Sequence, residues 1–167
     1  LPAKPNAAHK KLAELEQAGK LKAIVTQNID GLHQKAGSRR VYELHGSVLR
    51  NYCMDCGQAF ELEYIMDDAH CRGNIPICPK CGGIIKPDVV LYEESLDENC
   101  LMGAISAIEK ADTLIIGGTS LVVYPAAGLI QYFRGKNLVL INKQPTPYDK
   151  KADLVINDAI GKVMEVE

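Results

Sequence analysis

The sequence lacks the features that mark several classes of protein. No stretch approaches the roughly 20 consecutive apolar residues of a membrane-spanning helix, and no secretory signal is recognisable. No run of lysine and arginine suggests an anionic membrane, and a formal net charge of −2 gives no electrostatic reason to expect nucleic acid. Internal repeats and low-complexity segments are absent as well. We therefore expect no membrane and no nucleic acid among the partners, and a cytoplasmic location.

What the sequence contains is typical of one globular unit. Its 167 residues are 47% hydrophobic and 24% charged, which allows a buried core and is an ordinary charge content for a folded domain. The periodicity predicts helices at 6–22, at 101–108, from Pro125 and at the end of the chain, and strands at 23–25, 89–92, 113–116, 138–141 and 153–157. Continuous apolar strands that alternate with helices predict an α/β fold, with a parallel sheet covered on both faces.

Four of the six cysteines form two C-x-x-C pairs separated by 21 residues. They are Cys53, Cys56, Cys78 and Cys81. Each pair can place two thiolates on one tight turn, so the two pairs together offer four sulfurs to a tetrahedral Zn²⁺. Glycines that directly follow each pair suit such turns. An all-cysteine site has no open coordination position, so the metal would stabilise the structure and would not activate water.

A disulfide framework is the alternative use of these cysteines. The C-x-x-C spacing and the α/β pattern favour a metal in a reducing compartment instead. Little apolar sequence lies between the two pairs, so this segment cannot form an independent core. We expect the metal to supply much of its folding free energy.

Polar residues follow three of the predicted strands at the point where each strand ends. They are Gln27–Asp30, Gly118–Ser120 and Asn142. In a doubly wound sheet ligands bind beyond the carboxyl ends of the strands, where carboxylates and amides can hold ribose hydroxyls. A simpler alternative exists for each group, because Asn28, Asp30 and Ser120 could merely cap a turn or a helix. Three such groups at successive strand ends favour a nucleotide ligand.

His45 lies between Leu44 and Gly46, just upstream of the first cysteine pair. A single histidine beside apolar residues is more often structural than catalytic. It is still the best general-base candidate in the chain, because imidazole titrates near neutral pH. The other three histidines have the pattern of structural or solvated residues.

Taken in order, these motifs resemble those of the sirtuin family. The matching segments are 26–33 (TQNIDGLH), 43–46 (ELHG), the two cysteine pairs, 86–92 (KPDVVLY), 118–121 (GTSL) with Pro125, and Ile141-Asn142. The resemblance implies an NAD-dependent protein-lysine deacylase, acting on an acylated protein or peptide and releasing nicotinamide, acyl-ADP-ribose and free lysine. Acetyl is the expected acyl group. It also implies a Rossmann-type NAD-binding domain at 1–47 and 88–167, with an inserted zinc-binding module at 48–87.

The resemblance further implies catalytic roles for single residues. His45 would be the general base that takes a proton from a ribose hydroxyl, once the acyl oxygen has attacked the anomeric carbon and nicotinamide has left. Asn28 and Asp30 would act at the nicotinamide ribose, with Ile29 between them in the same cofactor-binding segment. Gln27 would contact ribose hydroxyls.

Other positions match the cofactor-binding residues near the end of the family's domain. Gly118, Thr119 and Ser120 would form the cofactor-binding turn. Asn142 would meet the adenosine ribose, and Ile160 would lie beside the adenine. These assignments also come from the resemblance and not from the spacing of the residues.

The substrate peptide would pair with Val90 and Tyr92 by strand addition, and the four paired cysteines would hold structural zinc. One departure from the family lies here, because Tyr92-Glu93-Glu94 replaces Phe-Gly-Glu and would narrow or recharge the peptide cleft.

A second departure is the lack of a Gly-Ala-Gly-x-Ser loop and of the Asp-Phe-Arg segment that follows it in sirtuins. The Rossmann-type sheet is therefore expected to be incomplete at its N-terminus. Those segments hold the pyrophosphate and the nicotinamide, so we expect these 167 residues alone to bind NAD weakly and turn over little. Transfer of ADP-ribose to protein, and binding of acylated peptide without catalysis, are the alternative functions.

Overall fold

The chain forms two compact units in the computed structural model, which describes residues 3–165. Among the described residues, unit 1 comprises 3–25, 32–42 and 97–165, and unit 2 comprises 26–31 and 43–96. Strands β1 (Ile24–Thr26) and β2 (Val41–Glu43) pair with each other, and the boundary between the units falls within both strands. None of the helices within residues 3–165 is long and apolar enough to cross a membrane.

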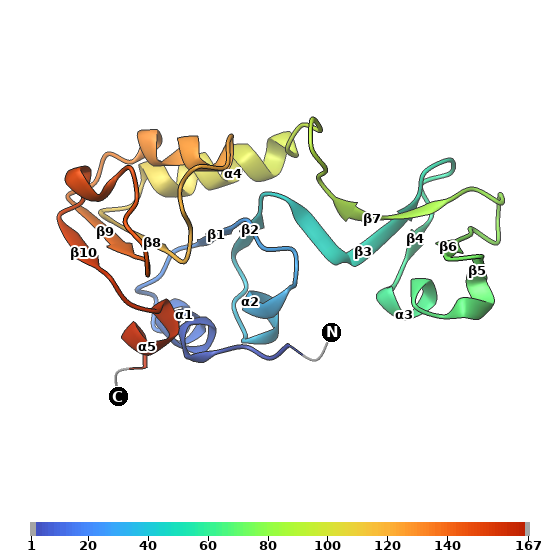
Figure 1. The fold of residues 1–167 in the computed structure, drawn as a ribbon, viewed down its shortest axis with the longest axis horizontal. Coiled ribbons are helices and arrows are strands. Elements are labelled where there is room, and N and C mark those ends of the chain that lie inside the picture. Colours follow the sequence, from blue (N-terminus) through green and yellow to red (C-terminus); the bar gives the residue numbers. More distant parts are fainter. Residues whose placement is uncertain (1–2, 166–167) are drawn as a thin grey trace. The chain divides into compact units, whose positions relative to one another are not determined.

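A three-stranded parallel sheet is the centre of unit 1 (Figure 1). Its strands are β8 (Thr113–Gly117), β9 (Asn137–Ile141) and β10 (Leu154–Ile156), in the order β10-β9-β8. The register places Ile115 opposite Val139. Leu140 on the central strand is only 2% exposed, as expected where a strand has a neighbour on each side. The parallel α/β arrangement predicted from the sequence is therefore confirmed.

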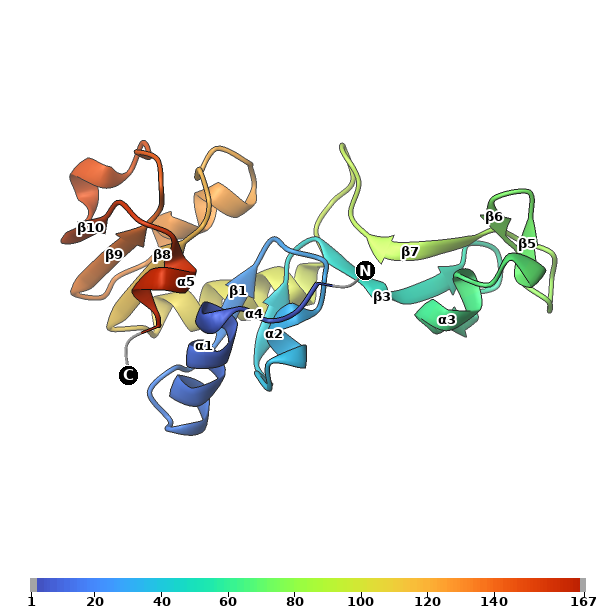
Figure 2. The same cartoon turned by 60° about the horizontal axis from the view of Figure 1, so that its bottom comes forward.

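Unit 1 also contains several helices. They are α1 (Ala7–Gln17), α2 (Leu32–Lys35), α4 (Glu98–Glu109), the 3₁₀-helices η2 (Ala126–Tyr132) and η3 (Asp149–Lys151), and α5 (Ile160–Val163). The side chain of Asn6 accepts a hydrogen bond from the His9 amide at 3.1 Å and so caps α1. Asp97 caps α4 in the same way. Figure 2 shows α5 beside α1 and the sheet strands together in unit 1.

The helix predicted from Pro125 is present as the 3₁₀-helix η2. One detail of unit 1 differs from the prediction. Strand β8 was predicted to be buried, yet its exposure alternates along the strand and Ile115 is 41% exposed. An apolar run cannot reveal which strand lies at the edge of a sheet, and β8 is an edge strand among the described residues.

Two antiparallel strands, β3 (Gly46–Cys53) and β7 (Ile85–Val89), run the length of unit 2 (Figure 1). Strand β4 (Ala59–Phe60) flanks β3 on its other side, giving the order β4-β3-β7. The remaining elements are α3 (Leu62–Ile65), η1 (Asp68–His70) and the hairpin of β5 (Cys71–Arg72) and β6 (Ile75–Pro76).

Strand β7 does not lie where the apolar run predicted it. The expected strand at 89–92 is instead the end of β7 followed by a turn, and the pairing begins at Ile85. Pro87 hides this strand in the sequence, since proline is unfavourable inside a sheet. Among the described strands β7 is an edge strand, where a missing N–H is tolerated.

The far end of unit 2 has a very small core. Cys53, Cys78 and Ile85 are its buried members, and Phe60, Tyr64 and Ile65 pack against them. Two of the three buried residues are therefore cysteines of the C-x-x-C pairs. Such a core is too small to stabilise a fold without help, which agrees with a role for metal.

Candidate functional site

His45 lies on a sharp turn between β2 and β3. Leu44, which precedes it, is 2% exposed, and Gly46, which follows it, has a φ of 76°. This φ lies in the left-handed region that favours glycine. A Cβ atom at Gly46 would also overlap the backbone carbonyl of Asp88 on the paired strand. The turn therefore requires glycine, which explains the His-Gly sequence physically.

The imidazole of His45 is held in one orientation. Its Nδ1 atom lies 3.1 Å from the carbonyl oxygen of Gln27. A carbonyl oxygen can only accept a hydrogen bond, so Nδ1 carries a proton, and in the neutral imidazole Nε2 is then the nitrogen with the lone pair. A neutral imidazole with an available Nε2 is the form that acts as a general base. This hydrogen bond is compatible with both the catalytic and the structural interpretation of His45, so its catalytic role stays a prediction.

The segment that follows β1 is fixed beside this histidine. The Leu44 amide donates to the Thr26 carbonyl at 3.0 Å, and the Asn28 amide donates to the Thr26 hydroxyl at 3.1 Å. The Val48 amide donates to the Ile29 carbonyl at 3.0 Å. Unit 2 therefore brings Gln27, Asn28 and Ile29 together with His45, and Asp30 continues the same segment. Their roles in binding a cofactor stay predictions.

The segment predicted to pair with a peptide continues from β7. The Val90 amide donates to the carbonyl of His45 at 3.1 Å, which ties the two segments together. Tyr92 is 100% exposed. Glu93 has a φ of 70°, an unusual value for a residue other than glycine, and it stands where the sirtuin pattern has glycine. Val90 and Tyr92 thus lie next to the His45 turn, and their pairing with a peptide stays a prediction.

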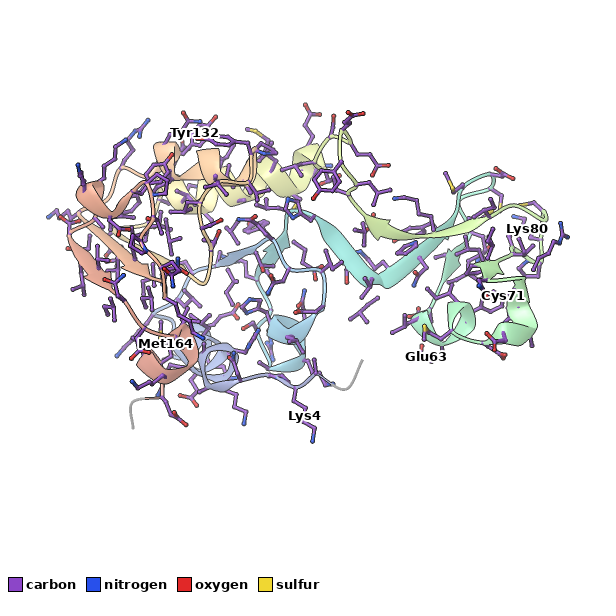
Figure 3. All side chains as sticks on the ribbon, viewed as in Figure 1. Lys4, Glu63, Cys71, Lys80, Tyr132 and Met164 are labelled. Carbon is purple, nitrogen blue, oxygen red and sulfur yellow. The ribbon has the colours of Figure 1, made fainter. Side chains whose placement is uncertain are left out.

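The four paired cysteines gather at one point of unit 2, and all their Sγ atoms lie within 4.8 Å of one another. The Cys53 and Cys81 sulfurs are 3.4 Å apart, and those of Cys56 and Cys78 are 3.7 Å apart. A tetrahedral zinc with Zn–S bonds of about 2.3 Å places sulfurs about 3.8 Å apart. The cluster therefore fits the ion. Figure 3 shows Cys71 on the same module, where its thiol faces the Asp67 carbonyl outside the cluster.

Backbone geometry supports this cluster. The amides of Gly57 and Gly82 donate to the Cys53 and Cys78 carbonyls at 3.0 and 2.9 Å, closing the two turns as predicted. The amide of Cys56 is the largest of the influences that lower the pKa of Cys53 to about 7. The Gly83 amide lowers the pKa of Cys81, but the neighbouring thiols outweigh it and raise that pKa to about 12. Thiolates this close repel one another, and a divalent cation removes that repulsion.

A second group of predicted residues lies in unit 1, at the carboxyl edge of the parallel sheet. The Gly118 amide donates to the Ile141 carbonyl at 3.0 Å, and the Asn142 amide donates to the Ile156 carbonyl at 3.1 Å. The Thr119 hydroxyl accepts from the Leu121 amide and shapes the turn, while Ser120 is exposed. The side chain of Asn142 donates to the Gln144 carbonyl at 2.8 Å. These residues share one sheet edge, as the strand-end argument predicted.

Ile160 lies at the same edge of the sheet, where it packs against Gly117, a residue that the sequence did not single out. A Cβ atom at Gly117 would overlap the side chain of Ile160. Gly117 therefore allows α5 to pack onto the end of β8. The two consecutive glycines could have indicated this close packing, but the sequence-based prediction assigned a role only to Gly118.

An ion-pair cluster in unit 2 was also missed. Arg50 donates to Glu43 at 2.7 Å and to Asp88 at 2.9 Å. Burial lowers the pKa of Arg50, but its hydrogen bonds to the two carboxylates outweigh burial and raise that pKa above its ordinary value. Charged residues spaced 7 and 38 positions apart give no local signal in the sequence.

A hollow in unit 1 has a volume of about 610 Å³, and none of the predicted site residues is among those that line it. Glu16, Arg39 and Arg40 contribute to its lining. The Glu16 carboxylate accepts from the Arg39 and Arg40 amides at 2.9 and 2.8 Å. These contacts hold a loop onto α1, and we assign the hollow no chemistry.

The chain resembles known proteins in both sequence and structure. A family model described as "Sir2 family" matches residues 1–125. Among curated proteins, the chain is 68% identical over 163 residues to an NAD-dependent protein deacetylase of Clostridium acetobutylicum. It is 70% identical over 162 residues to a protein of the same description from Clostridium perfringens. These alignments cover 98% and 96% of this chain and 65% of each relative, so the chain spans 65% of their length.

Solved structures agree with the sequence relatives. One described as "Sir2-p53 peptide-NAD+" superposes with a TM-score of 0.92 at 41% identity, covering 98% of this chain and 69% of that chain. Another, described as "Sir2 bound to acetylated peptide", has a TM-score of 0.92 at 40% identity with the same two coverages. At 41% and 40% identity, these structures resemble the chain in sequence as well as in fold.

Proposed function

The chain belongs to the Sir2 family, and on that premise we propose that its protein removes acyl groups, acetyl above all, from protein lysines with NAD as co-substrate. One water molecule would be consumed, and the products would be nicotinamide, acyl-ADP-ribose and free lysine. Two relatives that are 68% and 70% identical to this chain are described as NAD-dependent protein deacetylases. One similar structure is described with NAD+ and a peptide, and another with an acetylated peptide.

The observation that carries this proposal is the tautomer of His45. Its Nδ1–H donates to the Gln27 carbonyl at 3.1 Å, which leaves Nε2 as the proton acceptor. NAD supplies the electrophilic ribose carbon and the final acceptor of the acyl group. The protein then needs one base and correct orientation, and no catalytic metal. His45 would take a ribose hydroxyl proton at Nε2.

Cofactor contacts follow from this assignment. In unit 2, Gln27, Asn28, Ile29 and Asp30 are proposed to serve the nicotinamide ribose. The amide and carboxylate groups of this segment suit ribose hydroxyls. Support comes from the hydrogen bonds that hold Asn28 and Ile29 next to the His45 turn.

In unit 1 the proposed contacts lie at the carboxyl edge of the parallel sheet. The turn formed by Gly118, Thr119 and Ser120 would bind the cofactor, Asn142 would contact the adenosine ribose and Ile160 the adenine. The common edge of these residues supports the assignment, because ligands of open α/β sheets bind there.

The remaining assignments concern the substrate and the metal. Val90 and Tyr92 would pair with the acylated peptide, which adds to the free edge beyond β7. Residues 48–87 would form a zinc-binding module inserted into an NAD-binding domain at 1–47 and 88–167. The four clustered cysteines would hold a structural Zn²⁺ that fixes the ends of β3 and β7. Because such thiols need reducing conditions, we also propose a cytoplasmic location.

One experiment tests the function directly. The full-length gene product that contains these residues is incubated with NAD and an acetyl-lysine peptide, and the products are identified by mass spectrometry. We expect O-acetyl-ADP-ribose, nicotinamide and free lysine, and a fall in kcat of about 10²–10⁴-fold for His45→Gln. His70→Gln is the matched control, because His70 lies outside the proposed site and should leave the products unchanged.

Two outcomes would contradict the proposal. Label from NAD on the protein, without acyl-ADP-ribose in solution, would indicate ADP-ribose transfer instead of deacylation. Full activity of His45→Gln would show that the base is another group.

A further inference from the structure

The pairing of β3 with β7 is interrupted next to the His45 turn. Ser47 lies opposite Asp88, yet the next pair joins Asn51 to Pro87. Residues 48–50 therefore stand opposite a single peptide link and form a bulge in β3. Pro87 has no N–H to donate to the ladder, which explains why regular pairing fails at this point.

This bulge contacts the segment that holds the histidine. The Val48 amide donates to the Ile29 carbonyl at 3.0 Å. A Cβ atom at Gly31 would overlap the Leu49 side chain, so Leu49 packs directly onto that backbone. The position of residues 27–31 thus depends on the conformation of the bulge.

Arg50 ends the bulge and binds two carboxylates on different strands. Its Nη1 atom donates to Glu43 Oε2 at 2.7 Å, and its Nε atom donates to Asp88 Oδ2 at 2.9 Å. The Glu43 side chain is only 8% exposed, whereas those of Arg50 and Asp88 are 44% and 46% exposed. Arginine suits this arrangement because its planar guanidinium donates in two directions at fixed angles.

The two carboxylates flank the residues that matter for the proposed reaction. Glu43 precedes His45 by two residues, and Asp88 precedes Val90 by two residues. His45 and Val90 are themselves joined, through the Val90 amide and the His45 carbonyl at 3.1 Å. We propose that Arg50 is a positioning residue, which fixes the His45 turn against the Val90 segment so that base and substrate meet in one geometry. This inference rests on the proposed function of His45 and Val90.

A simpler role for Arg50 is that of a surface ion pair, and such pairs contribute about 0–1 kcal/mol. The low exposure of Glu43 argues for more, because removal of Arg50 would leave a nearly buried carboxylate without its cation. The two roles predict different results. Neutralising Glu43 should repair the loss if Arg50 only balances charge, and should fail to repair it if Arg50 also positions Asp88.

Amide hydrogen exchange tests the positioning without any assay of activity. In the zinc-loaded chain, Arg50→Ala should speed hydrogen exchange at the Val48 and Val90 amides about tenfold. The reason is that loss of a charged hydrogen-bond partner raises the equilibrium constant for local opening by about that factor. The Gly118 amide in unit 1 should not change. Lys11→Ala is the matched control, since it breaks the exposed Lys11–Glu14 pair at 3.0 Å and should leave all these amides as they were. Unchanged exchange at Val90 in Arg50→Ala would overturn the proposal.

Steady-state kinetics of the full-length gene product provide the second test. Arg50→Ala should raise the KM for acetyl-lysine peptide about tenfold and the KM for NAD by a smaller factor, because Arg50 binds Asp88 beside the peptide segment directly and acts on residues 27–31 only through the bulge. A loss of folded protein alone would lower the apparent kcat and leave both KM values unchanged. The double variant Arg50→Ala/Glu43→Gln should keep the high peptide KM, and full restoration by Glu43→Gln would overturn the proposal. If the unmodified protein shows no deacylation, the proposed function fails, while the exchange result still decides whether Arg50 holds the turn.

Discussion

Replacement of Gly46 by alanine tests how closely the His45 turn is held against β7. Two costs are expected. The first is conformational, because a φ of 76° in the left-handed region costs a residue with a Cβ atom roughly 1–2 kcal/mol. The second is steric, because the new Cβ would overlap the backbone carbonyl of Asp88, which cannot rotate away as a flexible side chain would. Strand β7 must then move.

That movement would break a hydrogen bond, and its contribution to the free energy of unfolding can be given. The Val90 amide donates to the His45 carbonyl at 3.1 Å. Loss of this hydrogen bond would cost about 1 kcal/mol. Together with the conformational cost, Gly46→Ala should lower the free energy of unfolding by about 2–3 kcal/mol. The same displacement separates the base from the proposed peptide segment, so deacylation should fall along with stability.

Gly73→Ala provides a matched control within unit 2. Gly73 has a φ of 66°, but a Cβ atom there would have no neighbour within 4 Å. This variant should lose only the same conformational cost, about 1–2 kcal/mol, and so remain about 1 kcal/mol more stable than Gly46→Ala. Urea unfolding of the two zinc-loaded variants, followed by circular dichroism, measures the difference. Equal losses within about 0.5 kcal/mol would refute the steric argument and with it the close approach of the turn to β7.

Three further predictions concern other parts of the molecule. Removal of zinc with a chelator should abolish the exchange protection of the Cys53 amide and preserve that of Gly118, because the core at the far end of unit 2 is small; retained protection at Cys53 would show that the metal is dispensable. Glu93→Gly should raise the urea midpoint by an amount equivalent to about 0.5 kcal/mol, since it relieves a φ of 70° but adds freedom to the unfolded chain; a lower midpoint would contradict this. The hydrogen bond from Lys162 lowers the pKa of Asp158. The pair therefore stabilises the fold at pH values above the ordinary pKa of a carboxyl group, and this stabilisation is lost as the pH falls through the lowered pKa. The melting temperatures of the natural protein and Asp158→Asn should differ at neutral pH and converge in acid.

Features that depend on neighbouring residues could be predicted from the sequence. Asn6 caps α1, and the Cys53 and Cys78 turns close through the glycines after each pair, because hydrogen bonds over three or four residues decide these structures. The parallel sheet of unit 1 was also predictable, since its strands are short apolar runs between helices. The strand-end argument placed Asn142 at the correct edge of the sheet for the same reason.

Features that depend on distant pairing could not be predicted. Strand β7 was displaced in the prediction because its pairing with β3 overrides the presence of Pro87. The cluster around Arg50 joins residues 7 and 38 positions away, and no periodic pattern connects them. The tautomer of His45 likewise depends on a carbonyl 18 residues earlier in the chain. Motif and spacing identified the histidine, and only the structure shows which nitrogen is available.

Strand β3 begins with Gly46, directly after His45, and ends with Cys53, a ligand of the proposed zinc site. Its length therefore constrains how the sequence can change during evolution. Deletion of one residue within the regularly paired segment Asn51–Cys53 would turn the cysteine side chain to the opposite face of the sheet and remove one sulfur from the cluster. The exposed stretch at the tip of the β5–β6 hairpin, residues 73–74, carries no such constraint, because a Cβ atom at Gly73 would have no neighbour within 4 Å. We expect insertions and deletions among relatives to gather in that stretch, which is also where a foreign segment could be introduced without loss of the fold.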